Sequence, residues 1–367
     1  MLSSLEADRR IILDFNAQIE PIELHLAELR SKRATVQARL DAYKYPVSKI
    51  PNEIISEIFL QFLPTYPLCP ELGGRYSPTI LTHICSQWRQ IALSTPQLWR
   101  AINSSDSAAG EIHTIKAWLG RCGSCPLSLE IRPAENERKG LLGMLDSQRA
   151  HIEHLKIVGA PIVLALLDSA MPRLRHLHLD LWAGSRSIKL DIAPLLRTAV
   201  LMDAACTVVQ LPWGQLTALA LRFGSPKEYC SILQQAPNLV HCALELKAYY
   251  NDEVILPEVN LPLLRSLVLK SPPQNVDTKM ITSLVAPALR ILKVSEQCIT
   301  TLGQNPFRPL SSFISKSTCE LDELCIIYPY NQKAPYVPLE HCQLEFSSIP
   351  SISANCGHHF DENIFDE

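Results

Sequence analysis

Residues 174–179 read Leu-Arg-His-Leu-His-Leu, in which an aliphatic residue stands at the first, fourth and sixth positions. The spacing recurs seven more times, with Ala199 and Cys242 at the fourth position of two instances. The eight instances begin at Ile152, Leu174, Leu196, Leu216, Leu239, Leu264, Leu289 and Leu321. Successive starts are 22, 22, 20, 23, 25, 25 and 32 residues apart. A pattern that recurs at such a period is typical of an array of stacked units.

Each instance predicts a β-strand, because its alternating aliphatic residues would share one buried face. A proline stands two residues before five instances, and its missing N–H stops the preceding helix or loop. These prolines are Pro172, Pro194, Pro237, Pro262 and Pro287. Helices are expected between strands, for example at Val163–Ala170 and Lys227–Gln235. The predicted fold class is therefore α/β, with residues 103–330 forming an irregular leucine-rich-repeat solenoid.

Both flanks of the repeats have a different character. Residues 103–110 are small and polar, which predicts a linker. A short helix around Trp118 and an alternating segment at residues 126–131 follow, and we expect that segment to be the first strand of the solenoid, within an N-terminal cap. Residues 331–367 lack the repeat and are expected to form a C-terminal tail.

The strand positions between the aliphatic anchors carry several basic and imidazole side chains, which we expect to face outward. These residues are His154, Arg175, His176, His178, Arg265, Arg290 and Lys293. Repeat arrays commonly bind partners on such a face. For any single residue, a solvated strand position explains the pattern equally well, so no target-binding residue is assigned.

The first 45 residues carry a heptad pattern, which predicts an amphipathic helix. Its apolar positions are Ile12, Phe15, Ile19, Ile22, Leu26, Leu29, Val36 and Leu40, and only Arg33 interrupts the alternation of three and four. A helix break or kink is expected at Pro21, because an internal proline removes a hydrogen bond and clashes with the preceding turn. Two interpretations stay open: a coiled coil that dimerises the chain, or a helix that folds back onto its own domain.

Residues 46–102 predict a module of short apolar helices. Ile50-Pro51-Asn52-Glu53-Ile54-Ile55, followed by Ile58-Phe59, begins it, and a loop from residue 64 to 78 follows. Residues 84–92 and 94–99 close it with Trp88 and Trp99. So few residues cannot bury this many apolar side chains alone, so the surplus must pack on a neighbouring domain or a partner. For Trp99, a joint to the next domain is the preferred interpretation.

The two ends of this module resemble the opening and closing helices of an F-box. The whole chain resembles a group of fungal proteins in which a helical leader precedes an F-box-like region and irregular leucine-rich repeats follow. The resemblance implies that the module binds the Skp-type adaptor of a cullin-RING ubiquitin ligase, although the loop at 64–78 is longer than in compact F-boxes. By motif position, the implied adaptor contacts are Ile50, Pro51, Ile54, Ile58, Phe59, Ile84, Trp88, Ile91 and Ala92.

Composition and charge exclude several classes of function. The 367 residues include 34 Lys and Arg against 37 Asp and Glu, which leaves no basic excess for nucleic acid or an anionic membrane surface. No apolar run reaches the roughly 20 residues that span a bilayer, and the first residues lack a signal-peptide pattern. We therefore expect a cytosolic or nuclear protein with reduced cysteines.

The pair Cys122 and Cys125 has the spacing of redox and zinc motifs. A zinc site would need further ligands nearby, and a thioredoxin-type pair would start a helix, whereas Pro126 and a strand follow here. We prefer to interpret Cys122 and Cys125 as a coincidental pair in a turn. The cluster of Cys356, His358 and His359 is interpreted as coincidental for the same reason. No phosphate-binding, dinucleotide-binding or nucleophile motif appears, so no enzyme activity, metal or cofactor is expected.

Three hypotheses follow from the sequence. The first is the substrate-recognition subunit of an SCF-type ubiquitin ligase, with the repeats binding a target protein. The second is a leucine-rich-repeat interaction scaffold unconnected to ubiquitin, in which the box-like segment is a buried cap. The third, a thiol or metal enzyme that uses Cys122 and Cys125, has the least support.

Overall fold

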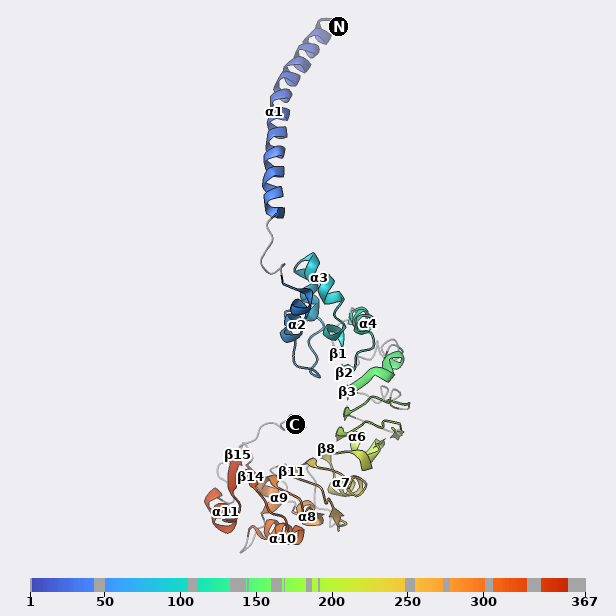
Figure 1. Ribbon diagram of the computed structural model, residues 1–367, viewed down its shortest axis with the longest axis vertical. Coiled ribbons are helices and arrows are strands. Elements are labelled where there is room, and N and C mark those ends of the chain that lie inside the picture. Colours follow the sequence, from blue (N-terminus) through green and yellow to red (C-terminus); the bar gives the residue numbers. More distant parts are fainter. Residues whose placement is uncertain are drawn as a thin grey trace. The chain divides into compact units, whose positions relative to one another are not determined.

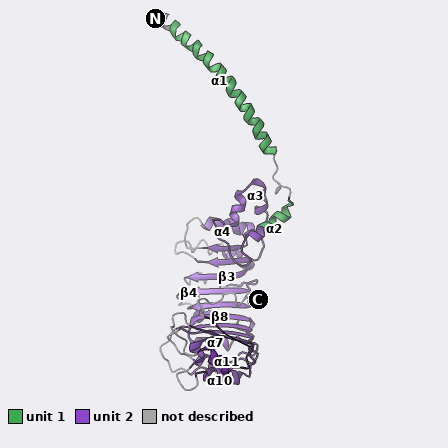
Figure 2. Ribbon diagram, turned by 90° about the vertical axis from the view of Figure 1, so that its left-hand side faces the viewer, with its two compact units in different colours: residues 1–58 green, residues 59–367 purple. Residues whose placement is uncertain are grey.

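The computed structural model describes residues 2–42, 50–104, 111–132, 143, 145–159, 167, 169–182, 187–190, 192–247, 255–272, 278–300, 306–328 and 338–355 (Figure 1). The chain divides into two compact units, residues 1–58 and residues 59–367 (Figure 2). The first is helical, and the second combines helices with a large parallel sheet. The protein is therefore a mixed α/β protein.

Helix α1 (Leu2–Ala42) forms most of the first unit and contains Pro21. Of the break or kink predicted at Pro21, the break is wrong, because the helix is continuous on both sides of it. A proline removes only one intrahelical hydrogen bond, and good helix formers such as the Ala-Glu-Leu run at 27–29 keep the remaining ladder intact. Every described side chain of α1 from Leu5 to Ala42 is exposed.

Helix α2 (Asn52–Phe62) follows and crosses the boundary between the units. Its first turn forms as the sequence predicts, since the carbonyl of Pro51 accepts hydrogen bonds from the N–H groups of Ile54 and Ile55 at 3.1 Å each. Glu53 lies in the same turn, where the helix dipole favours a negative charge.

Four further helices precede or flank the first strands of the second unit. They are η2 (Pro78–His83), α3 (Ser86–Leu93), η3 (Pro96–Trp99) and α4 (Glu111–Cys122). The Oγ of Ser77 caps η2 by accepting from the N–H of Thr79 at 3.2 Å, and it donates to the carbonyl of Leu72 at 2.9 Å. The side chain of Arg89 on α3 donates to the carbonyl of Thr82, at the end of η2, at 2.7 Å. These bonds hold the short helices against each other.

An eleven-stranded parallel sheet forms the largest part of the second unit (Figure 2), and its strand order follows the chain order. The strands are β1 (Ala101–Ser104), β2 (Leu127–Ile131), β3 (Ile152–Gly159), β4 (His176–Leu181), β6 (Thr198–Asp203), β8 (Ala218–Gly224), β9 (His241–Leu246), β11 (Ser266–Lys270), β13 (Ile291–Ser295), β14 (Glu323–Ile327) and β15 (Ser351–Asn355). All eight strands predicted from the repeat, and the one predicted at residues 126–131, are confirmed.

The register of the sheet matches the aliphatic positions of the repeat. The fourth positions are mutual Cα partners from strand to strand: Leu155, Leu177, Ala199, Leu219, Cys242, Leu267, Leu292 and Leu324. Each of these side chains is at most 2% exposed. A one-residue slip would turn the whole row outward, so burial of this row fixes the register.

The prolines before the strands lie in tight turns. The N–H of Leu174 donates to the carbonyl of Met171 at 3.2 Å, which places Pro172 at the second position of the turn. Equivalent bonds join Leu196 to Ala193 and Leu264 to Leu261. The fixed φ of proline suits this position, so each proline sets the chain direction just before a strand.

Shorter elements connect the strands (Figure 1). They are β5 (Ile188–Lys189), α6 (Ala205–Val208), β7 (Val209–Gln210), α7 (Pro226–Leu233), β10 (Val259–Asn260), α8 (Lys279–Ser283), β12 (Leu284–Val285), α9 (Glu296–Ile299), α10 (Arg308–Ser317) and α11 (Leu339–Glu345), with the single turns η4 (Arg149–His151) and η6 (Trp213–Gln215). Helix α7 matches the helix predicted at Lys227–Gln235 and begins with a capping box between Ser225 and Glu228. Most of the helix predicted at Val163–Ala170 lies outside the described residues.

The sheet extends beyond the strands that the sequence predicts. Strand β1 pairs with β2 and takes the place expected for the first strand, and it includes the start of the predicted linker. At the other end β15, within the predicted tail, pairs with β14. The first unit also ends inside the predicted module of residues 46–102.

Candidate protein-binding surfaces

Helix α2 carries an apolar face that is accessible to solvent. Ile54 and Ile58 are 53% and 51% exposed, and Phe62, one further turn along the helix, is 37% exposed. Residues four positions apart share one side of a helix. Ile55 and Phe59, on another side, are each 1% exposed. The helix therefore has one buried face and one exposed apolar face.

The nine implied adaptor contacts divide by exposure. Pro51, Ile54, Ile58 and Ile84 are exposed, and Ile50 and Trp88 are half-buried. Phe59, Ile91 and Ala92 are buried, so their side chains support the packing of the protein. Helical periodicity predicts that such residues fall on different faces, but it does not show which face is outward. The exposed fractions of the side chains in the structure show which of the nine residues face outward.

The buried residues of α3 pack around two aromatic contacts. The rings of Phe59 and Trp88 meet edge to face, with centroids 4.9 Å apart. The indole N–H of Trp99 donates to the carbonyl of Ala92 at 2.9 Å. The ring of Trp99 also meets that of Trp118 on α4 edge to face, at 5.4 Å. Trp99 therefore joins the short helices to the next segment, as the sequence predicts.

The loop at residues 64–78 contacts the first strands of the sheet. The Oγ of Ser128 on β2 donates to the carbonyl of Pro67 at 2.6 Å. The hydroxyl of Tyr66 donates to Oε2 of Glu153 at 3.0 Å, and the guanidinium of Arg100 lies 3.9 Å from the centre of the Tyr66 ring. Because these contacts join residues up to 87 positions apart, no local pattern in the sequence predicts them.

Two of the predicted histidines stack at the start of the sheet. His154 and His176 are partners on β3 and β4, and their rings are parallel with centroids 4.2 Å apart. Burial, assisted by His176 and Arg175, lowers the pKa of His154 to about 3. Burial and the nearby Lys156 lower the pKa of His178 to about 3. Both side chains are therefore neutral near pH 7.

A row of charged residues crosses three strands in the middle of the sheet. Arg222, Glu245 and Lys270 are successive partners on β8, β9 and β11. Burial raises the pKa of Glu245, while the two cations on either side lower it. A buried cluster of Ala220, Ala243 and Val268 lies on the same three strands. In this part of the sheet, a buried cluster of small apolar residues lies beside a row of alternating charges.

The remaining predicted face residues are the basic side chains of Arg175, Arg265, Arg290 and Lys293. Arg175, Arg265 and Arg290 each directly precede a strand, and their backbone N–H groups donate to the carbonyls of Glu153, Val240 and Arg265, respectively, at 2.8–2.9 Å. Arg175 pairs with Glu153 at 2.9 Å, and Arg290 pairs with Glu320 at 3.4 Å. Lys293 lies within β13. The structure brings the three histidines and Arg175 together on β3 and β4 and at the turn between them.

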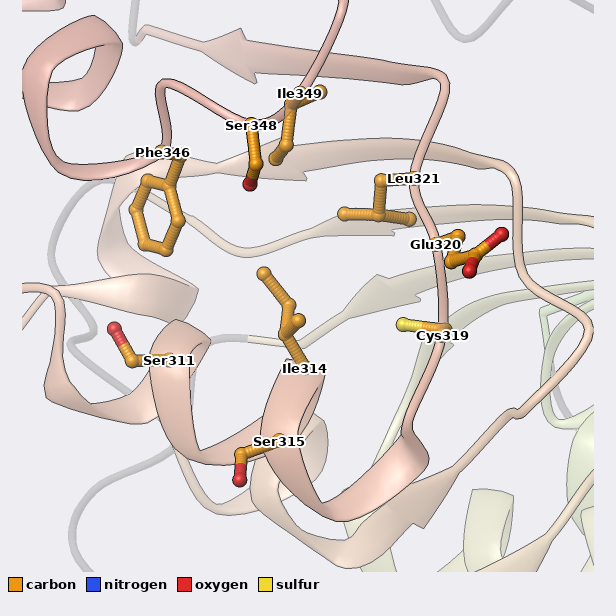
Figure 3. A pocket seen from close by; sticks show the side chains of 9 residues that line it. All are labelled: Ser311, Ile314, Ser315, Cys319, Glu320, Leu321, Phe346, Ser348 and Ile349. Carbon is orange, nitrogen blue, oxygen red and sulfur yellow. The ribbon is translucent and has the colours of Figure 1, made fainter.

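A pocket of about 360 Å³ lies near the other end of the sheet (Figure 3). Ile314, Leu321, Phe346 and Ile349 line it, together with three serines, Cys319 and Glu320. Glu320 is the only charged side chain among its nine lining residues. The pocket is an apolar surface depression between α10 and the segment that leads into β15.

The cysteines of the redox-like pair are free thiols. Cys122 ends α4 and is fully buried, its Sγ donates to the carbonyl of Leu119 at 3.1 Å, and burial raises its pKa to about 11. A thiol with a raised pKa is a poor nucleophile. Among the described residues, no group of three or more His, Cys, Asp and Glu side chains could hold a metal ion. Cys356, His358 and His359 lie outside the described residues.

Comparison of the sequence with protein-family models and with curated proteins finds no match. Within the described part of the chain, no helix is both long and apolar enough to cross a bilayer.

Proposed function

We propose that this chain is the substrate-recognition subunit of an SCF-type (cullin-RING) ubiquitin ligase. Residues 46–102 would bind the Skp-type adaptor, and a leucine-rich-repeat solenoid would bind a target protein. The chain would catalyse no reaction itself and would supply proximity between the target and the ligase. The observation that carries the proposal is the exposed apolar face of α2.

The exposure of Ile54 and Ile58 supports the adaptor-binding role, because both belong to the motif that resembles the opening of an F-box. Large apolar side chains that stay about half exposed on a short helix are typical of a protein-binding site. The residues that best fit an adaptor contact are Pro51, Ile54, Ile58 and Ile84. Ile50 and Trp88 would contribute at the margin, and Phe59, Ile91 and Ala92 would hold the helices in place.

The regular register of the sheet supports the repeat assignment. Its aligned aliphatic rows and its period of 20 to 32 residues fit a leucine-rich-repeat solenoid of uneven unit length. The strand face at β3 and β4, with its stacked histidines and ion pairs, is the part we favour for target binding. The chemistry there fits a polar protein surface rather than an apolar peptide.

The direct test is co-purification of the full chain with a Skp-type adaptor. The wild-type chain should form a stable complex by size-exclusion chromatography. The double variant Ile54→Asp, Ile58→Asp should bind about 30-fold more weakly, or not at all, since a charge at a buried contact removes a dominant interaction. Binding is measured by calorimetry.

A matched control is Ile192→Asp. Ile192 is 59% exposed, close to the exposure of Ile54, and it lies in the repeat region. This variant should bind the adaptor like the wild type. If the wild-type chain fails to bind, or if both aspartate variants bind equally well, the ligase proposal is wrong.

A second candidate function is a repeat scaffold unconnected to ubiquitin. The contacts of Trp99 with Trp118 and of Pro67 with Ser128 favour it, because they make the short helices and the loop at 64–78 a cap on the first strands. A scaffold would show no affinity for the adaptor, so the same experiment separates the two functions.

A further inference from the structure

The heptad positions of α1 form an exposed apolar seam along one side of the helix. The seam residues are 43–66% exposed: Ile12, Phe15, Ile19, Ile22, Leu26, Leu29, Val36 and Leu40. A spacing of 3.5 residues keeps such a stripe in line only when two helices wind around each other. Four heptads of exposed apolar residues therefore point to a partner helix with the same spacing.

Pro21 does not interrupt this seam. With Ile19 and Ile22 at the two core positions of one heptad, Pro21 falls at the third position, on the outer side of the helix. A bend there displaces backbone on the outer face and leaves the seam on the inner face continuous. The helix indeed continues through Pro21 from Leu2 to Ala42.

Arg33 occupies a core position of the seam and discriminates between two orientations of a partner copy. In a parallel, in-register pair, the two Arg33 side chains would face each other across the symmetry axis. In an antiparallel pair with Leu26 opposite Leu29, Arg33 lies opposite Ile22 and beside Glu23 of the other helix. Like charges in contact oppose association, so the antiparallel orientation is favoured.

The charged residues beside the seam also favour the antiparallel orientation. The antiparallel pairing brings Glu23 of one helix to within two residues of the level of Arg30 of the other, on the same side of the seam, and the two-fold symmetry repeats the pair. Neither residue has an opposite charge three or four positions away in its own helix. In the parallel arrangement, Glu23 would face Gln18 and Arg30 would face His25. Only the antiparallel arrangement thus uses these two charges.

We propose that α1 pairs with α1 of a second copy of this chain, antiparallel, through the seam from Ile12 to Leu40. The occupant of the seam is a second copy because the seam residues and the flanking charges are self-complementary. The pairing joins two full chains, and it does not depend on whether either chain binds an adaptor.

The first test is the mass of the full chain by analytical ultracentrifugation at several concentrations. The wild type should sediment as a dimer. Leu26→Asp, at a core position, should raise the dissociation constant at least about 30-fold. Leu24→Asp is the matched control, because Leu24 is 68% exposed but lies on the outer side of the helix, and it should leave the dimer intact. A monomeric wild type at 100 µM would overturn the proposal.

The second test fixes the orientation. Glu23→Arg and Arg30→Glu should each weaken the dimer about 5-fold, because each places like charges together at two symmetric positions. The combined variant Glu23→Arg, Arg30→Glu should restore wild-type affinity. Helix content by circular dichroism should be equal in all variants. Additive weakening in the combined variant contradicts the antiparallel pairing. A dimer that Leu24→Asp disrupts as strongly as Leu26→Asp contradicts the assignment of the seam.

Discussion

Helix α1 and the parallel sheet are both built on periodic aliphatic residues, yet the two regions use them differently. In the sheet, the row from Leu155 to Leu324 is almost completely buried, because each strand covers the next. In α1, the heptad residues from Ile12 to Leu40 stay about half exposed. The same kind of pattern thus indicates internal packing where units stack along one chain. In α1, we propose that it serves the binding of a second helix.

The largest expected difference concerns truncation of one leucine in each region. Leu219→Ala, in the middle of the sheet at 0% exposure, should lower the free energy of unfolding by about 2–5 kcal/mol through a buried cavity. Leu26→Ala in α1 should leave the unfolding of the sheet unchanged within about 0.5 kcal/mol. Urea unfolding followed by tryptophan fluorescence measures both. Equal losses would show that the sheet depends on α1 for its stability.

A smaller effect is expected from a single methyl group added to the sheet. A Cβ at Gly224 would come within 2.5 Å of the Tyr229 ring. The ring cannot move easily, because it is buried and its hydroxyl accepts from the N–H of Gly224 and donates to the carbonyl of Glu245. Gly224→Ala should therefore cost about 1–3 kcal/mol.

The matched change in α1 is Ser31→Ala. Ser31 is exposed on the helix, and its replacement by alanine adds no atoms. It should have no effect or be slightly stabilising, since alanine favours helix. Both variants are compared with the wild type by urea unfolding. A Gly224→Ala protein as stable as the wild type would show that the Tyr229 ring has room to shift.

The most gradual effect, at most about 1.4 kcal/mol per pH unit for each histidine, is a pH dependence confined to the sheet. The pKa values of His154 and His178 are lowered to about 3 in the folded protein, from about 6.5 when unfolded. The unfolded chain then binds more protons between these values, so their contribution to stability is present above pH 6.5 and is lost as the pH falls towards 3. His178→Gln should reduce the slope of stability against pH by up to about one proton over this range.

Urea unfolding at several pH values from 4 to 7 measures that slope. His154→Gln should act in the same direction, although it also removes the stack on His176 and so lowers stability at pH 7. An unchanged slope in both variants would mean that the two imidazoles protonate in the folded protein as readily as in the unfolded chain.

The sequence alone predicts the strands because their anchors are local and repeat often. The spacing of Leu216, Leu219 and Leu221 suffices to place β8 and its register. Strand β1 is not predicted because it lacks these anchors. Strand β15 has Ile349, Ile352 and Ala354 at the repeat spacing and pairs in register with β14, but with alanine at the sixth position and a terminal location its signal is the weakest in the array. The hydrogen bond between Tyr66 and Glu153 cannot be predicted from the sequence, because the two residues are distant in the chain. For the candidate adaptor contacts, the sequence indicates the residues, whereas the outward direction of Ile54 and the burial of Phe59 depend on the packing of the folded protein.

The order of the strands has a consequence for how the protein is made. Each strand pairs only with the strands before and after it among the strands of this sheet, and paired residues are 20 to 32 positions apart, as for Ala199 with Leu219 and Leu292 with Leu324. A nascent chain can therefore add one strand at a time as it leaves the ribosome, without waiting for distant residues. Growth of the sheet would follow translation, from β1 towards β15.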